Sequence, residues 1–556
     1  MNVFTSLRDL KRIKNIVSVL FKHEFGYFIE RLDLKKYLRF NRKIQQAKFS
    51  EQTLTPKRFR LAMEELGGSF IKLGQLLSLR PDLLPKEYCE EFFKLQDNVR
   101  PLSYRQVKSI IEKEFKQPLR QIFKSLDKHP IASASIGQVH KGKLKSGEKV
   151  AVKVQRPNMK ELFEADIDIM YKLAGMLEKR VPETKLYRPT QIIKEFEEYT
   201  KKELDHSQEA KNIDDFSKVN QNKDIVVPKV FWNYTKQKVL TMEFIDGKKI
   251  HNVKKFSDIN SYERIVMNNI ASSTIKQILE YRIFHADPHP GNILLLWDNK
   301  IALLDFGIVG RLDEDLAEKI ENVFISLMKP NSSLLANSLI KLNFVDKKVS
   351  QIELKKDLSE NLSKYYSVSS KEFNLTEAMY SVLAVSRKYE MQFPNDFVLL
   401  VKTLITVDGL AKTIYPSFNF IEELKPYTQE LIRKKSSTKY LIDSLKKTLL
   451  DFKNTFSKAP QEFKKTMRAV QSPKVKVDIE DADVQKFVLE LDRSSNRVSF
   501  GLIIAALLIG SALMFAAKLP PFVYDLSLVG IIFLIVAIIV SLLLVGSIYR
   551  EGRFKK

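Results

Sequence analysis

The spacing of apolar residues changes several times along the chain. Between residues 55 and 126 apolar side chains recur at helical spacing, and Pro81, Pro85 and Pro101 divide this stretch into several helices. From residue 130 the apolar runs become short and β-like, and the turn Lys145–Glu148 joins two of them, which predicts a hairpin. After an intervening helical stretch, "DIVVPKVFWN" and "KVLTMEFIDG" predict two further strands.

After Gly247 the pattern is mainly helical as far as about residue 430. One interruption, "NILLLWDNKIALLDFG", holds two apolar runs around Asp298 and Asn299 and predicts a second hairpin. The order is therefore a small sheet, helices, more sheet, and then a helical body with an embedded hairpin. This order predicts an α+β protein with the two lobes of an atypical protein-kinase-like fold, preceded by a helical extension.

Two uncharged apolar runs lie near the C-terminus, at residues 498–517 and 526–549. Each can cross a hydrocarbon core of about 30 Å as a helix, although a buried helical pair in a soluble core would have the same composition. Basic residues flank the two runs, with Arg493 before the first and Arg550 after the second. The positive-inside rule then predicts a two-span hairpin in the cell inner membrane, with the kinase-like part in the cytoplasm.

The charge balance indicates an anionic partner, because 92 Lys and Arg face 67 Asp and Glu, a net charge of +25. The basic stretches adjoin the apolar runs and match no nucleic-acid motif, so we expect anionic membrane lipids and no nucleic acid. Residues 1–60 alone hold 15 Lys and Arg against 5 Asp and Glu. Within them one apolar helical face either rests on an anionic bilayer or packs on the body of the protein; it consists of Ile13, Ile16, Val17, Leu20 and Phe21.

These changes of pattern divide the chain into six predicted segments. They are a basic amphipathic segment (1–54), a helical extension (55–128), a kinase-like N-lobe with a helical insertion (129–247), a kinase-like C-lobe (248–430), basic amphipathic helices with a linker (431–495) and a transmembrane hairpin (498–549). Cys89 is the only cysteine, which excludes a disulfide within the chain.

The chemistry-bearing residues follow the order found in kinases. Phosphoryl transfer requires a cation on the nucleotide phosphates, oxygen ligands for Mg²⁺ and a group that orients the nucleophile. Lys153 in "VAVKVQ" matches the strand lysine, "HADPHPGN" places Asp287 and Asn292 five residues apart, and Asp305 of "LLDFG" follows one hairpin later. We therefore predict ATP and Mg²⁺ as cofactors. Lys153 and Asp287 are the expected catalytic residues, and Asn292 and Asp305 are the expected metal ligands.

Two features depart from an ordinary protein kinase. The phosphate loop "ASASIGQVH" has a single glycine, and its predicted nucleotide-binding residues are Ala132, Ser133, Ala134, Ser135, Ile136 and Gly137. Its serines either donate hydrogen bonds to the phosphates or are ordinary turn residues. In addition, a helix capped by Asp313 is expected to begin soon after Asp305, which leaves no activation segment on which a peptide substrate could dock.

The chain resembles the UbiB family of atypical kinase-like proteins, which support ubiquinone biosynthesis. The resemblance covers about residues 55–330. It rests on four segments: "FIKLGQLLSLRPDLLP" with a K-x-G-Q motif, the loop "ASASIGQVH", "KELDHSQEA" with an E-x-D motif, and "HADPHPGN". The apolar C-terminal hairpin is a feature of the bacterial members.

The resemblance implies roles for further residues. Lys153 would pair with Glu209, while Lys72 and Gln75 would join the catalytic set over the active site. Lys72 would lie near Glu203 and Asp205, in the space where a peptide would otherwise bind. Glu243, in the hinge-like strand, completes the predicted nucleotide-binding set. The family resemblance also implies ATP hydrolysis without protein phosphorylation in trans, with isoprenoid-quinone precursors or quinone-biosynthesis proteins as partners.

Two alternative functions stay open at this stage. One is a small-molecule kinase of the aminoglycoside or choline kinase type, which also lacks the peptide-docking segment. The other is a pseudokinase scaffold that binds lipid and in which the nucleotide only switches conformation. The small-residue pairs Gly501/Ala505 and Ala537/Ser541 would allow close helix packing, either within the hairpin or in a homodimer.

Overall fold

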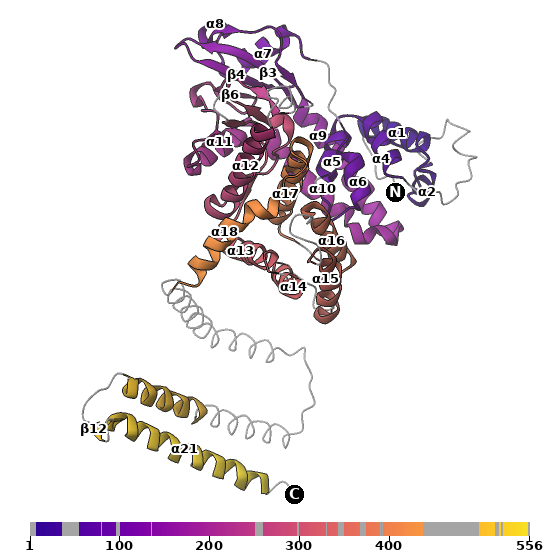
Figure 1. Cartoon of the computed structure of the whole chain (residues 1–556). Helices are drawn as coiled ribbons and strands as arrows, with labels where there is room; N and C mark the ends of the chain where they lie inside the picture. The colour runs from indigo at the N-terminus through magenta and orange to yellow at the C-terminus, as the bar shows by residue number, and fades with distance from the viewer. Residues whose placement is uncertain are drawn as a thin grey trace. The chain divides into compact units, whose positions relative to one another are not determined.

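The computed structural model describes most of the chain (Figure 1). The described residues are 7–35, 55–78, 80–95, 101–134, 136–250, 260–296, 300–329, 331–342, 350–366, 374–389, 391, 393–437, 500–516, 522–523 and 526–553. The chain separates into two compact units, Met1–Leu441 and Ile442–Lys556. The predicted basic helices at 431–495 lie mainly outside the described residues.

The first unit contains a five-stranded antiparallel sheet with the order β1-β3-β4-β6, in which β2 also pairs with β3. Its strands are β1 (Phe123–Leu126), β2 (Ala132–Ser133), β3 (Gly137–Leu144), β4 (Lys149–Gln155) and β6 (Val239–Glu243). The first predicted hairpin is confirmed, because β3 pairs with β4 across the Lys145–Glu148 turn. Gly147 adopts a φ of +110° in that turn, a conformation that favours glycine.

Helices precede the sheet and are inserted within it, as the apolar spacing predicts. The N-terminal segment holds α1 (Leu7–Lys22) and α2 (Gly26–Arg31). The extension holds α4 (Pro56–Leu66), α5 (Ser69–Ser78), α6 (Lys86–Phe92), α7 (Tyr104–Phe115) and α8 (Leu119–Ile122). The insertion holds α9 (Met159–Arg180), η2 (Pro182–Tyr187), α10 (Pro189–Glu203), α11 (His206–Val219), β5 (Ile225–Val226) and η3 (Trp232–Tyr234). A capping box formed by Ser103 and Gln106 starts α7, which lies beside the sheet (Figure 1). Its Val107 and Ile111 belong to the same hydrophobic cluster as residues of β1, β3, β4 and β6.

The C-lobe is mainly helical and carries two small sheets. Its elements are β7 (Lys248–Lys249), α12 (Asn260–Lys276), the π-helical turn η5 (Gln277–Tyr281), β8 (Ile283–His285), η6 (Pro290–Asn292), β9 (Ile293–Leu295), β10 (Ile301–Leu303), β11 (Val309–Arg311), α13 (Glu314–Leu327), α14 (Ser332–Lys341), α15 (Gln351–Tyr366), α16 (Leu375–Lys388), α17 (Asn395–Ile414) and α18 (Phe420–Lys435). The second predicted hairpin is confirmed as the antiparallel pair β9 and β10. Asp313 caps α13 by accepting a hydrogen bond from the Leu316 N–H at 2.8 Å, as predicted.

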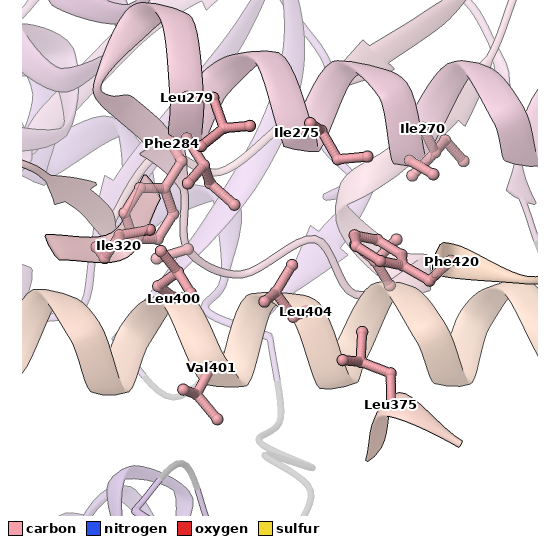
Figure 2. Close-up of a cluster of buried hydrophobic side chains, with 14 of the residues drawn as sticks. Ile270, Ile275, Leu279, Phe284, Ile320, Leu375, Leu400, Val401, Leu404 and Phe420 are labelled. Carbon is pink, nitrogen blue, oxygen red and sulfur yellow. The ribbon is translucent and has the colours of Figure 1, made fainter. Parts of the chain in front are cut away.

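The largest hydrophobic core fills the space between α12 and α17. Figure 2 shows Ile270 and Ile275 of α12 pointing toward α17, whose Leu400 and Leu404 point back toward them. Phe284 of β8 lies in the same cluster and is completely buried. The core therefore fixes the strand that leads into the predicted catalytic loop directly on α17.

The structure decides between the two readings of the N-terminal helix. In α1 the side chains of Ile13, Ile16 and Val17 are at most 1% exposed and belong to the cluster formed with α4, α5, α9 and α10. The Arg12 guanidinium anchors the helix through two hydrogen bonds to Asp166 of α9, at 2.8 and 3.0 Å. The apolar face thus packs on the body of the protein, and the bilayer alternative for this face is wrong.

The second unit contains two apolar helices, which pack against each other. In α21 (Leu528–Arg553), residues Leu528–Gly546 are long and apolar enough to cross a membrane, and only 11% of that stretch is buried. The first predicted span is described as a helix over Phe500–Ala516, which is 17 residues, so its crossing stays a prediction. Gly530 lies against Phe515, and the Ser511 hydroxyl donates a hydrogen bond to the Gly530 carbonyl at 2.8 Å. These small residues allow the two helices to approach closely.

Candidate active site

A cavity of about 600 Å³ collects most of the residues that the sequence singled out. Its walls come from α5, the strands β3 and β4, the turn between α10 and α11, the loop after β8, and α17. The predicted residues that line it are Lys72, Gln75, Ala134, Ile136, Gly137, Lys153, Glu209, Asp287 and Asp305. Residues up to 330 positions apart in the sequence (Lys72 and Lys402) therefore meet at one cavity.

Lys153 of β4 is at the centre of a charge cluster. Its Nζ atom donates hydrogen bonds to both Glu209 carboxylate oxygens, at 2.9 and 2.8 Å, and lies 3.4 Å from Asp305 Oδ2. Burial alone would lower the pKa of Lys153, but the two carboxylates outweigh burial and raise it. Lys153 is therefore a fixed cation, and its predicted pairing with Glu209 is present in the structure.

The two acids around Lys153 respond to burial differently. Burial raises the pKa of Glu209 to about 7, against the opposing effect of Lys153. Burial would also raise the pKa of Asp305, but Lys153 and the Gly307 N–H outweigh it and hold this pKa well below its usual range. Asp305 has a φ of +48°, in the left-handed region that non-glycine residues rarely adopt. A permanently ionised carboxylate is thus held in a strained backbone at the cavity, as functional sites often have.

His285 ties the catalytic loop to the segment after β10 that carries Asp305. Its Nδ1 accepts a hydrogen bond from the Asp287 N–H at 3.2 Å, and its Nε2 lies 2.8 Å from the Leu304 carbonyl. The π-helical turn η5 contributes Gln277, whose side-chain oxygen accepts the His285 N–H at 3.0 Å. The first residue of "HADPHPGN" therefore sets the distance between the two acids, because one imidazole is bonded to both segments.

Asn292 is held so that its amide oxygen is available to a ligand. Its side-chain NH₂ donates to the Asp287 carbonyl at 3.2 Å, and the residue is 9% exposed. With the nitrogen engaged on the loop, the oxygen is left as an acceptor. The five-residue spacing of Asp287 and Asn292 produces this contact within one loop.

Lys402 of α17 is a site residue that the sequence analysis missed. Its Nζ donates a hydrogen bond to Asp287 Oδ1 at 2.7 Å, and its side chain is only 7% exposed. Burial would raise the pKa of Asp287, but Lys402 and then His289 outweigh it and lower this pKa. The available signal was a single lysine inside an otherwise apolar stretch, "FVLLVKTLITV", since a buried lysine requires a partner.

A second missed residue, Arg156, fastens the phosphate loop. It donates to the Ala134 carbonyl at 3.0 Å and to the Ser133 hydroxyl at 2.9 Å. Gly137 is required where β3 and β4 meet, because a Cβ there would lie 2.7 Å from the Val154 carbonyl oxygen. The Ser133 hydroxyl thus accepts a hydrogen bond that holds the loop in place. Neither Ala132 nor Ser133 is among the described residues that line the cavity. Ser135 lies outside the described residues.

Lys72 of α5 reaches across the cavity to the E-x-D motif. Its Nζ lies 2.5 Å from Glu203 Oε1 at the end of α10, a contact between residues 131 positions apart. Gln75 lies on the same helix as Lys72, and its side-chain NH₂ donates a hydrogen bond to the Leu95 carbonyl at 3.2 Å. Asp205 caps α11 by accepting from the Ser207 N–H at 3.0 Å. The extension therefore covers the site through an ion pair, while Asp205 holds the start of the next helix.

Glu243 lies at the end of β6. Its backbone N–H donates to the Lys229 carbonyl at 2.8 Å, and its carboxylate accepts from the Lys229 N–H at 3.3 Å. The residue is exposed and is not among the described residues that line the cavity. Its predicted role with the nucleotide stays a prediction.

The donor set fits a magnesium–nucleotide complex. Asp305 offers a carboxylate beside Lys153, and Asn292 offers an amide oxygen, which is the hard-oxygen chemistry that Mg²⁺ prefers. Asn292 is bonded to the Asp287 carbonyl but is not among the described residues that line the cavity, so its role as a metal ligand stays a prediction. Within the described residues no group of three or more His, Cys, Asp and Glu could hold a metal ion unaided. A metal here would therefore complete its shell with phosphate oxygens and water, as Mg²⁺ does in phosphoryl-transfer sites.

A second cavity, of about 570 Å³, adjoins the first beyond Lys402. It lies between α5 and α6 on one side and α16 and α17 on the other. Its walls are mainly apolar and include Phe93, Tyr380, Ile405, Leu410 and Ile414. Lys402 and Pro290 line both cavities, so the catalytic loop separates a charged compartment from an apolar one.

Comparison with known proteins agrees with this geometry. Residues 94–339 match the model of the ABC1 atypical kinase-like domain, residues 358–419 match the UbiB helical domain, and residues 482–550 match the ABC1/UbiB kinase-like C-terminal domain. These three matches cover the cavity apart from the wall that α5 and α6 contribute, the helices behind it and the apolar hairpin.

Three relatives cover most of the chain. A protein of Clostridium pasteurianum named for its position in the hydrogenase 1 5' region is 29% identical over 97% of this chain and 99% of its own length. The chloroplastic protein ACTIVITY OF BC1 COMPLEX KINASE 7 of Arabidopsis thaliana is 30% identical over 81% of this chain and 65% of its own. The probable protein kinase UbiB of Marinobacter nauticus is 31% identical over 73% of this chain and 75% of its own. This chain belongs to the UbiB family of atypical kinase-like proteins.

Proposed function

We propose that this protein is a membrane-associated, Mg²⁺-dependent ATPase or atypical kinase that supports isoprenoid-quinone biosynthesis. The observation that carries the proposal is the convergence of Lys153, Asp287 and Asp305 on one cavity, with Asn292 bonded to the Asp287 carbonyl behind it. Mg²⁺, when bound with the nucleotide, would neutralise charge that develops on the transferred phosphoryl group. Asp305 and Asn292 would hold it.

The residues of the chain have separable tasks in this reaction. Lys153, fixed by Glu209, would bind the nucleotide phosphates. Asp287, held ionised by Lys402, would orient the nucleophile rather than act as a strong base, because its pKa is lowered. The Lys72–Glu203 pair would exclude a peptide chain from the cavity. These tasks favour water or a small acceptor over a protein substrate.

Two observations support a membrane-linked acceptor. The second cavity beside Lys402 offers mainly apolar walls to a molecule approaching Asp287. The helix α21 presents apolar side chains outward, with Leu542 and Leu543 more than two-thirds exposed. Anionic lipids and isoprenoid-quinone precursors or quinone-biosynthesis proteins are accordingly the partners we propose, with the kinase-like part on the cytoplasmic side of the cell inner membrane and two spans anchoring it.

Hydrolysis of ATP by the purified full-length protein in anionic liposomes tests the first part. Asp305→Asn removes the carboxylate charge that we expect to bind the metal. ATP turnover should therefore fall at least about 10³-fold. Asp315→Asn is the matched control, because that carboxylate lies on the exposed start of α13 and pairs with Lys319 one turn along the same helix. Equal turnover in wild type and Asp305→Asn would contradict the proposal.

Quinone profiling tests the second part. A deletion strain that carries the wild-type gene should accumulate quinone, while one that carries Asp305→Asn should not. Full restoration by Asp305→Asn would favour the pseudokinase scaffold instead. Membrane association is measured by carbonate extraction, where we expect the wild type in the membrane pellet and a variant with Ile538 and Ile539 both changed to Lys in the soluble fraction.

A further inference from the structure

His206 is a buried histidine next to the charge cluster of Lys153, Glu209 and Asp305, and its ring is not hydrogen-bonded to any of the three. It is the first residue of α11, directly after the cap Asp205, and its backbone N–H donates to the Gln237 carbonyl at 3.0 Å. The residue is 2% exposed, yet it lines the cavity that contains Lys153 and Asp305. Its Nδ1 lies 3.8 Å from Glu209 Oε2, which is too far for a hydrogen bond.

Neither ring nitrogen of His206 has a hydrogen-bond partner within the described residues. Burial, and then the charge of Lys153, lower the pKa of His206 to about 3, so the ring is neutral at physiological pH. A neutral imidazole carries one N–H donor and one acceptor. Leaving such a buried group unsatisfied costs roughly 1–3 kcal/mol, and native proteins nearly always pair it with protein, water or ligand.

The neighbourhood of His206 limits what the missing partner can be. Glu209 already accepts from Lys153 through both oxygens, and Asp305 lies against the same lysine. Within the described residues no group of three or more His, Cys, Asp and Glu could hold a metal ion unaided, so a metal would enter together with the nucleotide. What remains is an acceptor that enters the cavity and also suits Lys153, which is an anionic oxygen.

We propose that His206 donates its ring N–H to a phosphate oxygen of the bound nucleotide, as a binding residue in addition to Lys153. The assignment rests on the proposed use of ATP and deepens it. A neutral donor suits this position, because a second cation beside Lys153 would repel it, whereas an N–H adds a hydrogen bond without charge. The nucleotide-free state then contains a group that becomes satisfied only on binding.

This assignment predicts that one substitution at position 206 raises the thermal stability of the nucleotide-free protein and weakens its binding of Mg·ATP. His206→Leu keeps an apolar volume in the buried position but removes both ring nitrogens. The nucleotide-free protein should become more stable, with a midpoint of thermal unfolding a few degrees higher, because an unsatisfied polar group is gone. The affinity for Mg·ATP, measured by calorimetry on the full-length protein in nanodiscs, should fall about tenfold to a hundredfold, as for a hydrogen bond to a charged acceptor.

His140 provides the matched control. It is also completely buried, but its Nδ1 lies 2.8 Å from the Asp127 carbonyl and its Nε2 lies 2.7 Å from Gln138. His140→Leu should therefore lower the unfolding midpoint and leave the affinity for Mg·ATP unchanged. His206→Gln, which retains an N–H donor, should recover most of the affinity that His206→Leu loses.

Three outcomes would overturn the assignment. The first is an unchanged affinity for Mg·ATP in His206→Leu. The second is an affinity loss seen with Mg²⁺ but not with ATP in EDTA, since that pattern indicates a metal-bound water rather than a phosphate oxygen. The third is a wild type that binds no ATP at all, which overturns the proposed function together with this assignment. Loss of affinity in both media, with the wild type binding normally, supports it.

Discussion

The two walls of the active-site cavity each present a buried lysine to an acid, but they do so differently. On the N-lobe wall, Lys153 is shared between Glu209 and Asp305, and its side chain is 20% exposed. On the C-lobe wall, Lys402 pairs with one carboxylate among the described residues, that of Asp287, and is 7% exposed. The first lysine lies on β4, a central strand of the five-stranded sheet, and lines the cavity, whereas the second is embedded in a core helix.

This difference indicates different tasks. A lysine shared by two carboxylates can exchange one of them for a phosphate when a nucleotide enters, since the other still neutralises it. A buried lysine that loses its carboxylate partner would leave an unpaired charge in the interior. Lys153 is thus suited to binding ligand, while Lys402 is suited to holding Asp287 in place. Substitutions on the two walls can separate these tasks.

The largest effect on turnover is expected for Lys153→Met. Removing the cation leaves Glu209 and Asp305 facing the phosphates with uncompensated charge, so ATP turnover should fall about 10²–10³-fold. Steady-state hydrolysis with varied Mg·ATP measures this effect. Lys149→Met, on the exposed end of the same strand, should retain wild-type turnover, and a comparable loss there would show that the strand rather than the ammonium matters.

Compared with Lys153→Met, we expect Lys402→Met to lose less ATP turnover and more folding stability. The variant leaves Asp287 without its partner, so the free energy of unfolding should fall by about 3 kcal/mol and turnover by about 10–100-fold. Chemical denaturation and ATP hydrolysis measure the two quantities.

A double variant sharpens this result. Adding Asp287→Asn to Lys402→Met removes the stranded charge and should recover most of the lost stability, though not turnover. Lys412→Met is the control on the same helix, because Lys412 is 37% exposed and pairs within α17 with Asp408. Additive stability losses at positions 402 and 287 would mean that the two groups do not act as a pair.

A moderate effect on binding is expected for Arg156→Met. Its guanidinium joins Ala134 and Ser133, so losing it should loosen the phosphate loop and weaken Mg·ATP affinity about tenfold, with a smaller change in the maximal rate. Calorimetry and steady-state kinetics measure the two changes. A fall in the maximal rate with normal affinity would place Arg156 in the transition state instead.

The smallest effect is expected at Cys89 of α6, beside the apolar cavity. Burial raises the pKa of the Cys89 thiol to about 12, so at pH 8 it is protonated and unreactive. Iodoacetamide should leave the native protein unmodified and label it fully in 6 M guanidinium (about the concentration that unfolds stable proteins). Rapid native labelling, read by mass spectrometry, would show that the extension opens readily over the cavity.

The sequence determined those features that a short stretch of chain can encode. The five-residue spacing places Asp287 and Asn292 on one loop, the apolar runs give the β3–β4 and β9–β10 hairpins, and Asp313 caps the helix that replaces an activation segment. Each depends on local geometry, where turn chemistry and hydrogen-bonding reach are set by neighbours. The family resemblance added the Lys153–Glu209 pair, which local geometry does not reveal.

Only the tertiary structure decided the rest. Lys402 and Asp287 are 115 positions apart, so no local pattern connects a lysine in an apolar helix with a catalytic loop. From the sequence, the apolar face of α1 was equally suited to a bilayer or to packing on protein. In the structure it is buried against α4 and α9, so it packs on protein. Arg156 and His206 read as ordinary polar residues until their neighbours were known. Periodicity fixes which face of an element is apolar, but the partner of a charge depends on how distant elements pack.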